Sequence, residues 1–417
     1  MAHPHSWIDQ MARSARPCAV LIGSMLLLFM ARTARTQSIP RFLLMEERRL
    51  DAQREDFSNL GRVLVGKGDM AVVPLYQDFQ IRLYDSTGKA IARFGSRGDG
   101  PGEFQNLVSA RIGWVSDTLW IFDPATYRLT YINREGRLIR STVLPPSLQE
   151  ARPGLEPKTV LVSFTPYGIR GDGTLLGVAV RGVLDSVGRV RGEAREYAHA
   201  RDGKLSQTIA RVPENAGVVS VQRGTKIESA GVPYFAVPLR DIASDASRLA
   251  FVTTTFTDRT NGSYRVTVVR QTGDTVFSRT FPFEGRPVTP RSRDSALTSI
   301  MSLAGDPKID EELRQKARVL APHAYPPIRN IVIGLDDTVW LQLDDRADGP
   351  NWLILDGRGR VEGQVVLPRG AILSQARRGT IWVTEPDASG LRSVVRYRVT
   401  KNLFRFSSEA PAPSTAR

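Results

Sequence analysis

The sequence predicts an all-β fold, a six-bladed β-propeller with a small α-helical insertion between the fourth and fifth blades. Three observations support this prediction: a strand phrase that recurs six times, a hairpin phrase that follows each copy, and 35 Gly and 26 Pro among 417 residues. Apolar residues make up 41% of the chain and charged residues 24%, a composition that excludes a disordered polypeptide. The chain is also long enough to bury a large core.

The first phrase begins with a turn residue, continues with a small or polar residue and enters an apolar strand. Its copies start at Gly68, Asp117, Gly173, Ser247, Asp337 and Gly379. The second phrase is a strand, a polar turn and another strand, and it covers 83–94, 131–144, 198–212, 268–281, 353–367 and 395–406. Each pair of phrases predicts a four-stranded antiparallel sheet with hairpins at Gly, Asp and Asn. A single sheet of this kind cannot bury both faces, whereas six sheets stacked radially can.

Three tryptophans and the two ends of the repeat region indicate how the ring packs and closes. Trp120, Trp340 and Trp382 occupy the same position in three copies, so we expect their rings to fill the wedges between neighbouring sheets, with ligand stacking as the alternative. Closure requires the two ends to share a sheet. We therefore expect part of 42–50 to pair near 394–398 or 403–406, with a helix over 43–50 as the alternative.

The helical insertion is predicted from a change of hydrophobic period between the fourth and fifth copies. Leu297, Ile300 and Met301 follow helical spacing, and a second helix begins after Asp306 and is stopped by Pro322. The insertion spans about 290–322. Blade-to-blade connections and the loops between second and third strands leave a propeller on one face, so we expect the insert beside the channel mouth, as a partial lid or a docking surface.

An export signal is predicted at the start of the chain. The apolar run from Cys18 to Ala31 follows Arg13 and Arg16 and is short for a bilayer span, with an uncleaved anchor as the alternative. We assign 1–34 to the signal, 35–406 to the propeller and 407–417 to a disordered tail. We expect a periplasmic or secreted protein with no stable membrane span after signal removal. Cys18 is the only cysteine, so the exported chain would hold together without disulfides and would lack a thiol nucleophile.

The chain is basic, but its charge is not gathered. The formal net charge is +14, carried mostly by arginines scattered along predicted strands and turns. This pattern favours a basic solvated surface over a nucleic-acid interface. We expect a monomer with no nucleic-acid partner.

A Gly-rich loop carries a family resemblance. The stretch RFGSRGDGPGEF (93–104), followed by TLWIFD (118–123) and TYRLTYINREGRLIRS (126–141), resembles the NHL-repeat family and its bacterial six-bladed propeller relatives. The matching residues are Phe94, Gly95, Gly98, Gly100, Pro101, Gly102, Phe104, Asp123, Arg128 and Leu129. The resemblance is specific over 60–145, fair over 327–400 and weak over 146–285. It implies a funnel-shaped ring with a central channel and, for most members, binding of proteins or small ligands without one shared chemistry.

Motifs for catalysis are scarce. Outside the signal the histidines are His199 and His323, which lie far apart in the sequence, and no G-x-S-x-G motif is present. Enzymes that resemble this architecture, such as lactonases and lyases, hold a divalent cation with acidic, Asn or His groups at the channel mouth. The candidate binding residues on the predicted loop face are Arg97, Asp99, Glu103, Asp123, Arg128, Asp344, Arg346 and Glu385, with surface ion pairing as the alternative role.

These observations favour a non-catalytic binding module for a protein or a small ligand on the insert-bearing face. We assign no catalytic residue and expect no cofactor. The alternative is a metal-dependent, lactonase-like hydrolase or lyase with Ca²⁺ or Zn²⁺ at the channel mouth.

Overall fold

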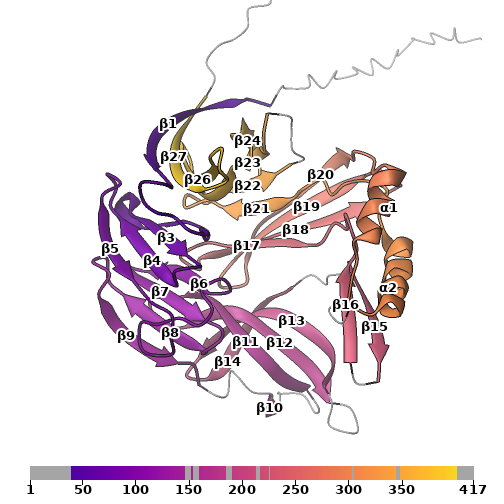
Figure 1. Cartoon of the computed structure of the whole chain (residues 1–417), viewed down its shortest axis with the longest axis horizontal. Helices are drawn as coiled ribbons and strands as arrows, with labels where there is room; N and C mark the ends of the chain where they lie inside the picture. Colours follow the sequence, from indigo (N-terminus) through magenta and orange to yellow (C-terminus); the bar gives the residue numbers. More distant parts are fainter. Residues whose placement is uncertain are drawn as a thin grey trace, which may run out of the picture. The chain divides into compact units, whose positions relative to one another are not determined.

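The computed structural model describes residues 39–145, 152–153, 159–184, 190–212, 217–224, 226–302, 305–343 and 348–401. Within 40–401 the strands form six antiparallel sheets arranged as the blades of a ring (Figure 1), as the sequence predicts. The predicted export signal, the tail 407–417 and the pairing segment 403–406 lie outside the described residues. No helix in the described part of the chain is both long and apolar enough to span a bilayer.

The blades follow one another along the chain. Blade 1 contains β2 (Leu64–Val65), β3 (Ala71–Leu75), β4 (Gln80–Tyr84) and β5 (Ala90–Phe94), and blade 2 contains β6 (Arg111–Val115), β7 (Thr118–Asp123), β8 (Arg128–Ile132) and β9 (Leu138–Val143). Blade 3 contains β11 (Thr159–Ile169), β12 (Leu175–Leu184), β13 (Val190–Arg201) and β14 (Lys204–Arg211), with the short β10 (Arg152–Pro153) paired to β11. Blade 4 contains β17 (Leu239–Ile242), β18 (Arg248–Phe256), β19 (Asn261–Arg270) and β20 (Thr275–Glu284), and blade 5 contains β21 (Asn330–Ile333), β22 (Val339–Gln342), β23 (Asn351–Leu355) and β24 (Val361–Val366).

Blade 6 closes the ring with strands from both ends of the propeller. It contains β25 (Ile372–Arg377), β26 (Thr380–Pro386) and β27 (Arg392–Lys401), and β1 (Phe42–Leu50) is its outermost strand. β1 runs antiparallel to β27, from Phe42 opposite Lys401 to Leu50 opposite Val394. The predicted pairing of 42–50 with 394–398 is therefore confirmed, and this segment is a strand rather than a helix.

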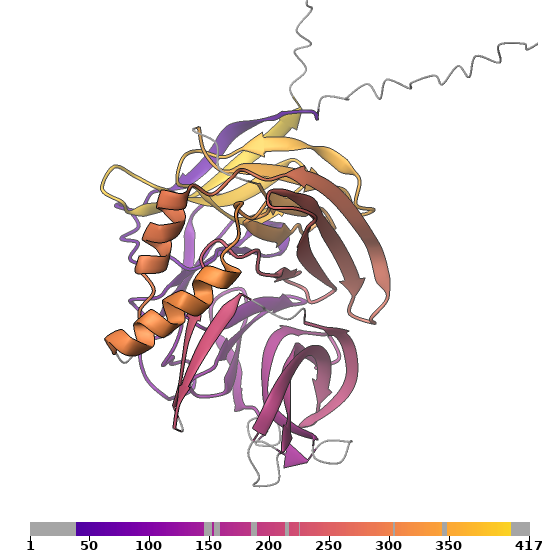
Figure 2. The ribbon, with the colours of Figure 1, turned by 90° about the vertical axis from the view of Figure 1, so that its right-hand side faces the viewer.

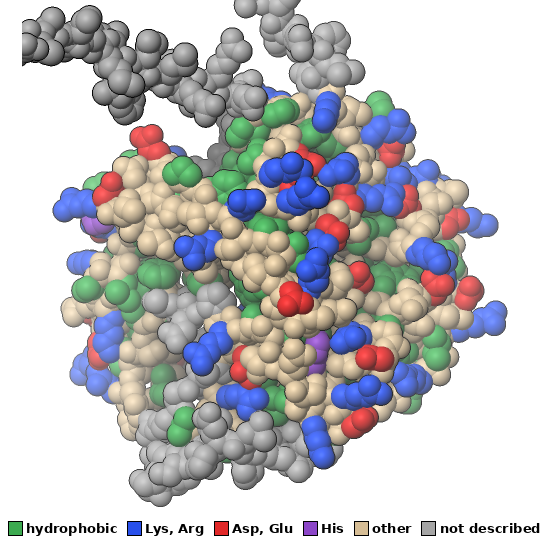
Figure 3. All heavy atoms as spheres, turned by 180° about the vertical axis from the view of Figure 1, so that it is seen from behind, with side chains coloured by type: hydrophobic (Ala, Val, Ile, Leu, Met, Phe, Trp, Pro, Cys, Tyr) green, Lys and Arg blue, Asp and Glu red, His purple; other side chains and the backbone are tan. Residues whose placement is uncertain are grey.

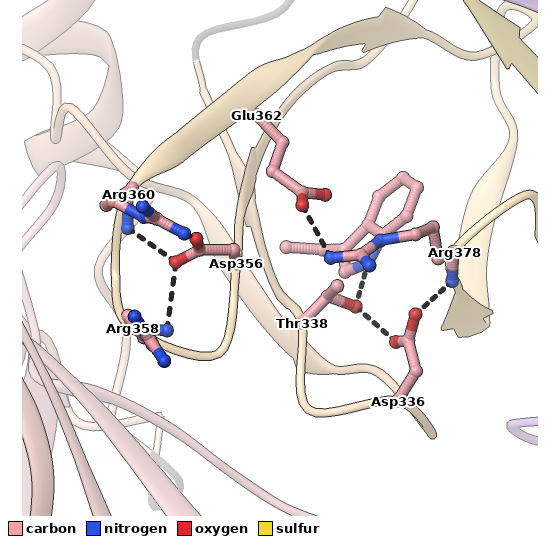
Figure 4. Close-up of polar contacts among 8 residues, drawn as sticks. Asp336, Thr338, Asp356, Arg358, Arg360, Glu362 and Arg378 are labelled. Atoms are coloured by element: carbon pink, nitrogen blue, oxygen red, sulfur yellow. Dashed lines mark hydrogen bonds and ion pairs between the residues drawn. The ribbon is translucent and has the colours of Figure 1, made fainter.

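The second phrase of the repeat is a turn that an Asp or Asn side chain stabilises. In blades 1, 2 and 5, the side-chain oxygen of Asp85, Asn133 or Asp356 accepts hydrogen bonds of 2.8–3.1 Å from the amides two and four residues later. A glycine with positive φ completes each turn three residues after the Asp or Asn, at positions 88, 136 and 359. Figure 4 shows the Asp356 carboxylate with Arg358 and Arg360. In these three blades the recurring phrase is thus explained by the geometry of one turn. The sixth copy, predicted over 395–406, is wrong in its described part, which belongs to the continuous strand β27, because β1 supplies the fourth strand of that blade.

The core is divided into clusters that lie between blades. Each of the six gaps between adjacent blades holds a buried apolar cluster, including the gap between blades 6 and 1. Trp120, Trp340 and Trp382 are 0%, 1% and 4% exposed and pack in the gaps 2/3, 5/6 and 6/1 respectively. Their predicted role as wedge fillers is confirmed, and each ring contributes a large apolar area to the contact between two sheets.

The two predicted helices lie between β20 and β21. α1 (Pro290–Thr298) and α2 (Pro307–Leu320) begin after Thr289 and Asp306, whose side chains accept amide hydrogen bonds of the first turn. Their buried residues pack against β15 (Val218–Arg223) and β16 (Lys226–Gly231), a separate two-stranded hairpin that the sequence analysis missed. We call these four elements the insert module. Figure 2 shows the helices on one side of the ring, and Figure 1 places the module at its edge.

Candidate binding site in the central channel

Three predicted binding residues lie in the Gly-rich connection between β5 and β6. The Glu103 carboxylate accepts a 2.8 Å hydrogen bond from the amide of Gly100. The Asp99 carboxylate accepts one from the side-chain amide of Gln105. The guanidinium of Arg97 lies 5.6 Å from the centroid of the Phe79 ring. These contacts stabilise the connection itself, and ligand binding by the three residues stays a prediction.

Asp123 and Arg128 lie at the second and third strands of blade 2. Asp123 is 1% exposed, and its carboxylate accepts hydrogen bonds from the amides of Gln105 at 2.7 Å, Asn106 at 3.3 Å and Ala125 at 2.9 Å. It therefore fastens the Gly-rich connection to the end of β7. Arg128 Nη1 donates to Ser141 Oγ at 3.4 Å on the neighbouring strand.

Glu385 occupies in blade 6 the strand position that Asp123 occupies in blade 2. Its buried carboxylate accepts a 3.0 Å hydrogen bond from Arg49 Nη2 on the closing strand β1. Burial and the neighbouring Glu385 carboxylate raise the pKa of the Tyr397 hydroxyl. Asp344 and Arg346 lie outside the described residues. The structure thus groups five of the predicted residues around blades 1 and 2 and places Glu385 in another blade.

Two cavities lined by described residues lie along the channel between the inner strands, and none of the six described candidate residues lines either one. The first cavity, of about 530 Å³, lies among blades 1, 5 and 6, and its polar side chains are Asn59, Arg62, Asn330, Ser374, Thr384 and Arg392. The second cavity, of about 400 Å³, lies among blades 1 to 4 and touches blade 6 at Gln375. Volumes of this size suit a small organic molecule.

An ion pair spans the channel where the two cavities meet. Arg62 precedes β2 and donates to both oxygens of Asp241 on β17, with Nη1 to Oδ1 at 2.8 Å and Nη2 to Oδ2 at 3.1 Å. Arg62 Nε also donates to the carbonyl of Ser374 at 3.0 Å, and the amide of Ile333 donates to Asp241 Oδ2 at 2.8 Å. The pair joins blades 1, 4, 5 and 6. The carboxylate of Asp241 raises the pKa of the Arg62 guanidinium, which stays charged.

The second cavity holds two further arginines. Arg111 lies over the ring of Tyr167, at 4.8 Å from its centroid, and its Nη2 donates to the tyrosine hydroxyl at 3.3 Å. Its Nε atom is buried and has no hydrogen-bond partner in the described part of the chain. Arg240, beside Asp241 on β17, is exposed, and its guanidinium makes no hydrogen bond or ion pair with the described residues. Burial raises the pKa of the Tyr197 hydroxyl, and the charge of Arg240 opposes that rise.

Charge in this cavity is therefore unbalanced. Three guanidinium groups face one carboxylate, and Arg62 neutralises that carboxylate through the bidentate pair. The outer surface differs: Figure 3 shows basic and acidic side chains interspersed over the face behind Figure 1. The predicted scatter of surface charge is consistent with that view.

No group of three His, Cys, Asp or Glu side chains able to hold a metal ion occurs among the described residues. His199 lies on β13 and is 3% exposed, with an Nε2 atom that lacks a partner in the described ranges. Burial lowers the pKa of His199, assisted by the charge of Arg170, so the ring is neutral at neutral pH. It lines neither channel cavity.

Sequence reasoning missed the arginines of the channel. A signal for them was present, because Arg62, Arg111 and Arg240 each stand in or just before the short strand that precedes a copy of the first phrase. That strand is innermost in a propeller blade, so a charged residue on it faces the channel more readily than one on an outer strand.

Comparison with known proteins yields remote structural similarity only. No protein-family model matches the sequence, and no curated protein matches it. The solved structures that resemble it include virginiamycin B lyase from Staphylococcus aureus, as a catalytically inactive variant with quinupristin (12% identity, TM-score 0.38, covering 86% of this chain and 99% of that one). A DUF4221 family member from Bacteroides vulgatus (12%, 0.44, 86% and 98%) and regucalcin, a calcium-binding protein from Agrobacterium tumefaciens (11%, 0.37, 88% and 97%), also resemble it. None of the three singles out the NHL family, and all are too remote to support a functional conclusion.

Proposed function

We propose that this chain is an exported, non-catalytic binding module that takes a small ligand into the second channel cavity. The observation that carries the proposal is the composition of this cavity, in which charged, phenolic and aliphatic side chains converge on about 400 Å³. Tyr76 follows the second strand of blade 1, and Leu107 and Val108 belong to a blade-to-blade connection. Both kinds of loop leave a propeller on the face that carries the insert module. A ligand would therefore enter from that face.

The insert module does not line either cavity, so its proposed role differs from that of a lid over the site. The helices pack on the hairpin β15–β16 at the edge of the ring. We propose that the module lies at the edge of the face from which the ligand enters, without covering the cavity.

No observation on the described residues favours the metal-dependent hydrolase or lyase. The second cavity presents guanidinium and phenol groups, whereas hard divalent cations prefer carboxylate, carbonyl and water oxygens. Its one carboxylate, on Asp241, is already occupied by Arg62 and by the amide of Ile333.

A cavity-blocking variant tests ligand binding. Val108 is 61% exposed at the cavity mouth, so Val108→Trp should obstruct entry without disturbing the core. Val319→Trp, at an 85% exposed position on α2, is the matched control. A chemically varied panel of small molecules should contain compounds that raise the melting temperature of the wild type and of the control but not of the blocked variant. Equal responses in all three proteins would contradict the site.

Two further measurements address catalysis and export. Incubation with lactones in the presence of Ca²⁺ or Zn²⁺ should give no turnover, and turnover abolished by a chelator would overturn the non-catalytic proposal. N-terminal sequencing of protein recovered outside the cytoplasm should find a mature end near residue 35. Retention of the whole chain inside the cell would contradict export.

A further inference from the structure

We propose that the ligand of the second cavity is an organic anion, whose carboxylate or phosphate group is bound by Arg240 and Arg111. This inference rests on the proposed function and names the chemical class of its ligand. It is carried by the placement of two arginines whose charge no described carboxylate neutralises.

The second cavity carries more positive than negative charge. Among the described residues that line the cavity, Asp241 supplies the only carboxylate, and Arg62 donates to both of its oxygens. The positive charge of Arg62 and the negative charge of Asp241 therefore nearly cancel, and the pair exerts little net attraction on a bound ion. The charges of Arg111 and Arg240 therefore remain, and they attract an anion to the cavity.

The guanidinium groups of Arg240 and Arg111 supply the N–H donors for an anion. The guanidinium of Arg240 has no hydrogen-bonded or ionic partner among the described residues, so none of them competes with a ligand for its donors. Such a fork matches the two oxygens of a carboxylate or phosphate. Arg111 is held in place by Tyr167 and by the carbonyl of Ser109, to which its Nη1 donates at 3.0 Å. Its orientation is thus fixed before a ligand arrives, which lowers the entropy cost of binding.

The remaining lining of the second cavity is aromatic and aliphatic. Tyr76, Tyr167 and Tyr197 line the cavity together with the aliphatic side chains of Leu64 and Ile112. These rings and alkyl groups offer contact to an apolar or aromatic body but not to a compact inorganic ion. An organic anion can place its charged group at the arginines and its apolar or aromatic part against the tyrosine and aliphatic side chains.

The test compares an anion with its neutral analogue on purified protein in low-chloride buffer. The probes are benzoate, phenyl phosphate, inorganic phosphate and the neutral benzamide, and calorimetry gives their affinities. Benzoate or phenyl phosphate should bind at least about tenfold more tightly than benzamide, a difference of about 1.4 kcal/mol. The stronger of the two identifies the carboxylate or the phosphate as the preferred group, and added salt should weaken both.

Two charge-removing variants locate the site. Arg240→Gln should weaken binding of the preferred anion by about tenfold, because it removes one charged fork. Arg270→Gln removes the same charge from an exposed position on β19 of the same blade and should leave affinity within about twofold. Arg240→Lys keeps the charge and should retain part of the affinity. Equal melting temperatures of the variants show that the fold is intact.

The outcomes separate this inference from the proposed function. Equal binding of benzoate and benzamide, blocked by Val108→Trp, would leave the binding module in place and overturn the anion preference. Anion binding that Arg240→Gln and Arg270→Gln weaken equally would overturn the site. Failure of every anion to bind would overturn the inference as well.

Discussion

Arg62 and Asp241 meet across the channel, and their bidentate contact at 2.8 and 3.1 Å links the inner face of blade 1 to that of blade 4. Through Ser374 and Ile333 the same two side chains also bind the inner strands of blades 5 and 6. A ring held only by contacts between neighbouring blades can deform by small tilts at each gap. An ion pair across its centre opposes such tilts, and it lies where the two cavities meet because Arg62 lines both of them.

Removal of either partner of the Arg62–Asp241 ion pair is expected to destabilise the fold. Asp241 is only 7% exposed in its side chain, so Arg62→Gln leaves a buried carboxylate without its main partner. We expect a loss of about 1–3 kcal/mol in the free energy of unfolding, limited because the Arg62 side chain is 47% exposed. Urea denaturation measures this loss.

The double variant Arg62→Gln with Asp241→Asn provides the control. It leaves no unpaired charge, so its loss should be smaller than the sum of the two single losses. If the loss in the double variant equals the sum of the two single losses, the two residues are not coupled, and the ion pair does not stabilise the fold.

Trp340 and Trp120 offer a matched comparison of one hydrogen bond. Both rings are buried at the same strand position, but Trp340 Nε1 donates to Thr338 Oγ1 at 2.9 Å, and Trp120 Nε1 has no partner in the described residues. The Thr338 hydroxyl in turn donates to the Asp336 carboxylate, which also accepts a hydrogen bond from the backbone amide of Arg378 in the next blade (Figure 4). Trp340→Phe should therefore cost about 1–2 kcal/mol more than Trp120→Phe.

Thermal and urea unfolding of the two variants measure this difference. The loss of ring volume is the same at both positions, so it cancels in the comparison to first order. An equal or larger loss for Trp120→Phe would mean that packing, and not the link from Trp340 through Thr338 to blade 6, decides the outcome.

Asp123 is expected to act on the Gly-rich connection rather than on a ligand. Replacement by Ala removes the acceptor of three amides and should cost about 1–3 kcal/mol. Limited proteolysis should then cleave the connection 95–110 sooner than in the wild type. Asp99→Ala, which alters an exposed contact of the same connection, is the control and should stay close to the wild type in stability. Loss of ligand binding with unchanged stability would instead support the binding role predicted for Asp123 from sequence.

Blades 1, 2 and 5 could be predicted because the same local turn recurs in all three. Asp85, Asn133 and Asp356 mark turns whose hydrogen bonds lie within five residues of chain, so the pattern is visible in the sequence. The closing strand was predictable because a propeller must pair its two ends. The hairpin β15–β16 was not predicted, because its sequence resembles neither repeated phrase. Its apolar side chains are buried only by contact with helices about eighty residues away in the sequence.

The channel site depends on contacts between distant segments, and this explains why it was missed. Arg62 and Asp241 are separated by 179 positions, and no local pattern relates them. The predicted residues were instead chosen from conspicuous loop motifs. Asp123 and Glu385 proved to be anchors for neighbouring backbone and for the closing strand, a role that follows from their strand ends but not from their charge alone.

Protonation of the buried His199 ring is expected to oppose folding. Burial places the pKa of His199 below its ordinary value of about 6.5, with Arg170 lowering it further and Asp172 opposing this, while its strand neighbours Leu176 and Gln207 do not titrate. In the unfolded chain the ring regains the ordinary pKa, so below about pH 6.5 the unfolded state binds more protons than the folded state. The free energy of unfolding should therefore fall as pH decreases from about 6.5 toward the lower pKa of the folded state. His199→Gln should remove that part of the pH dependence in urea denaturation series run at each pH. A His199→Gln series parallel to the wild type would show that protonation of this ring does not oppose folding.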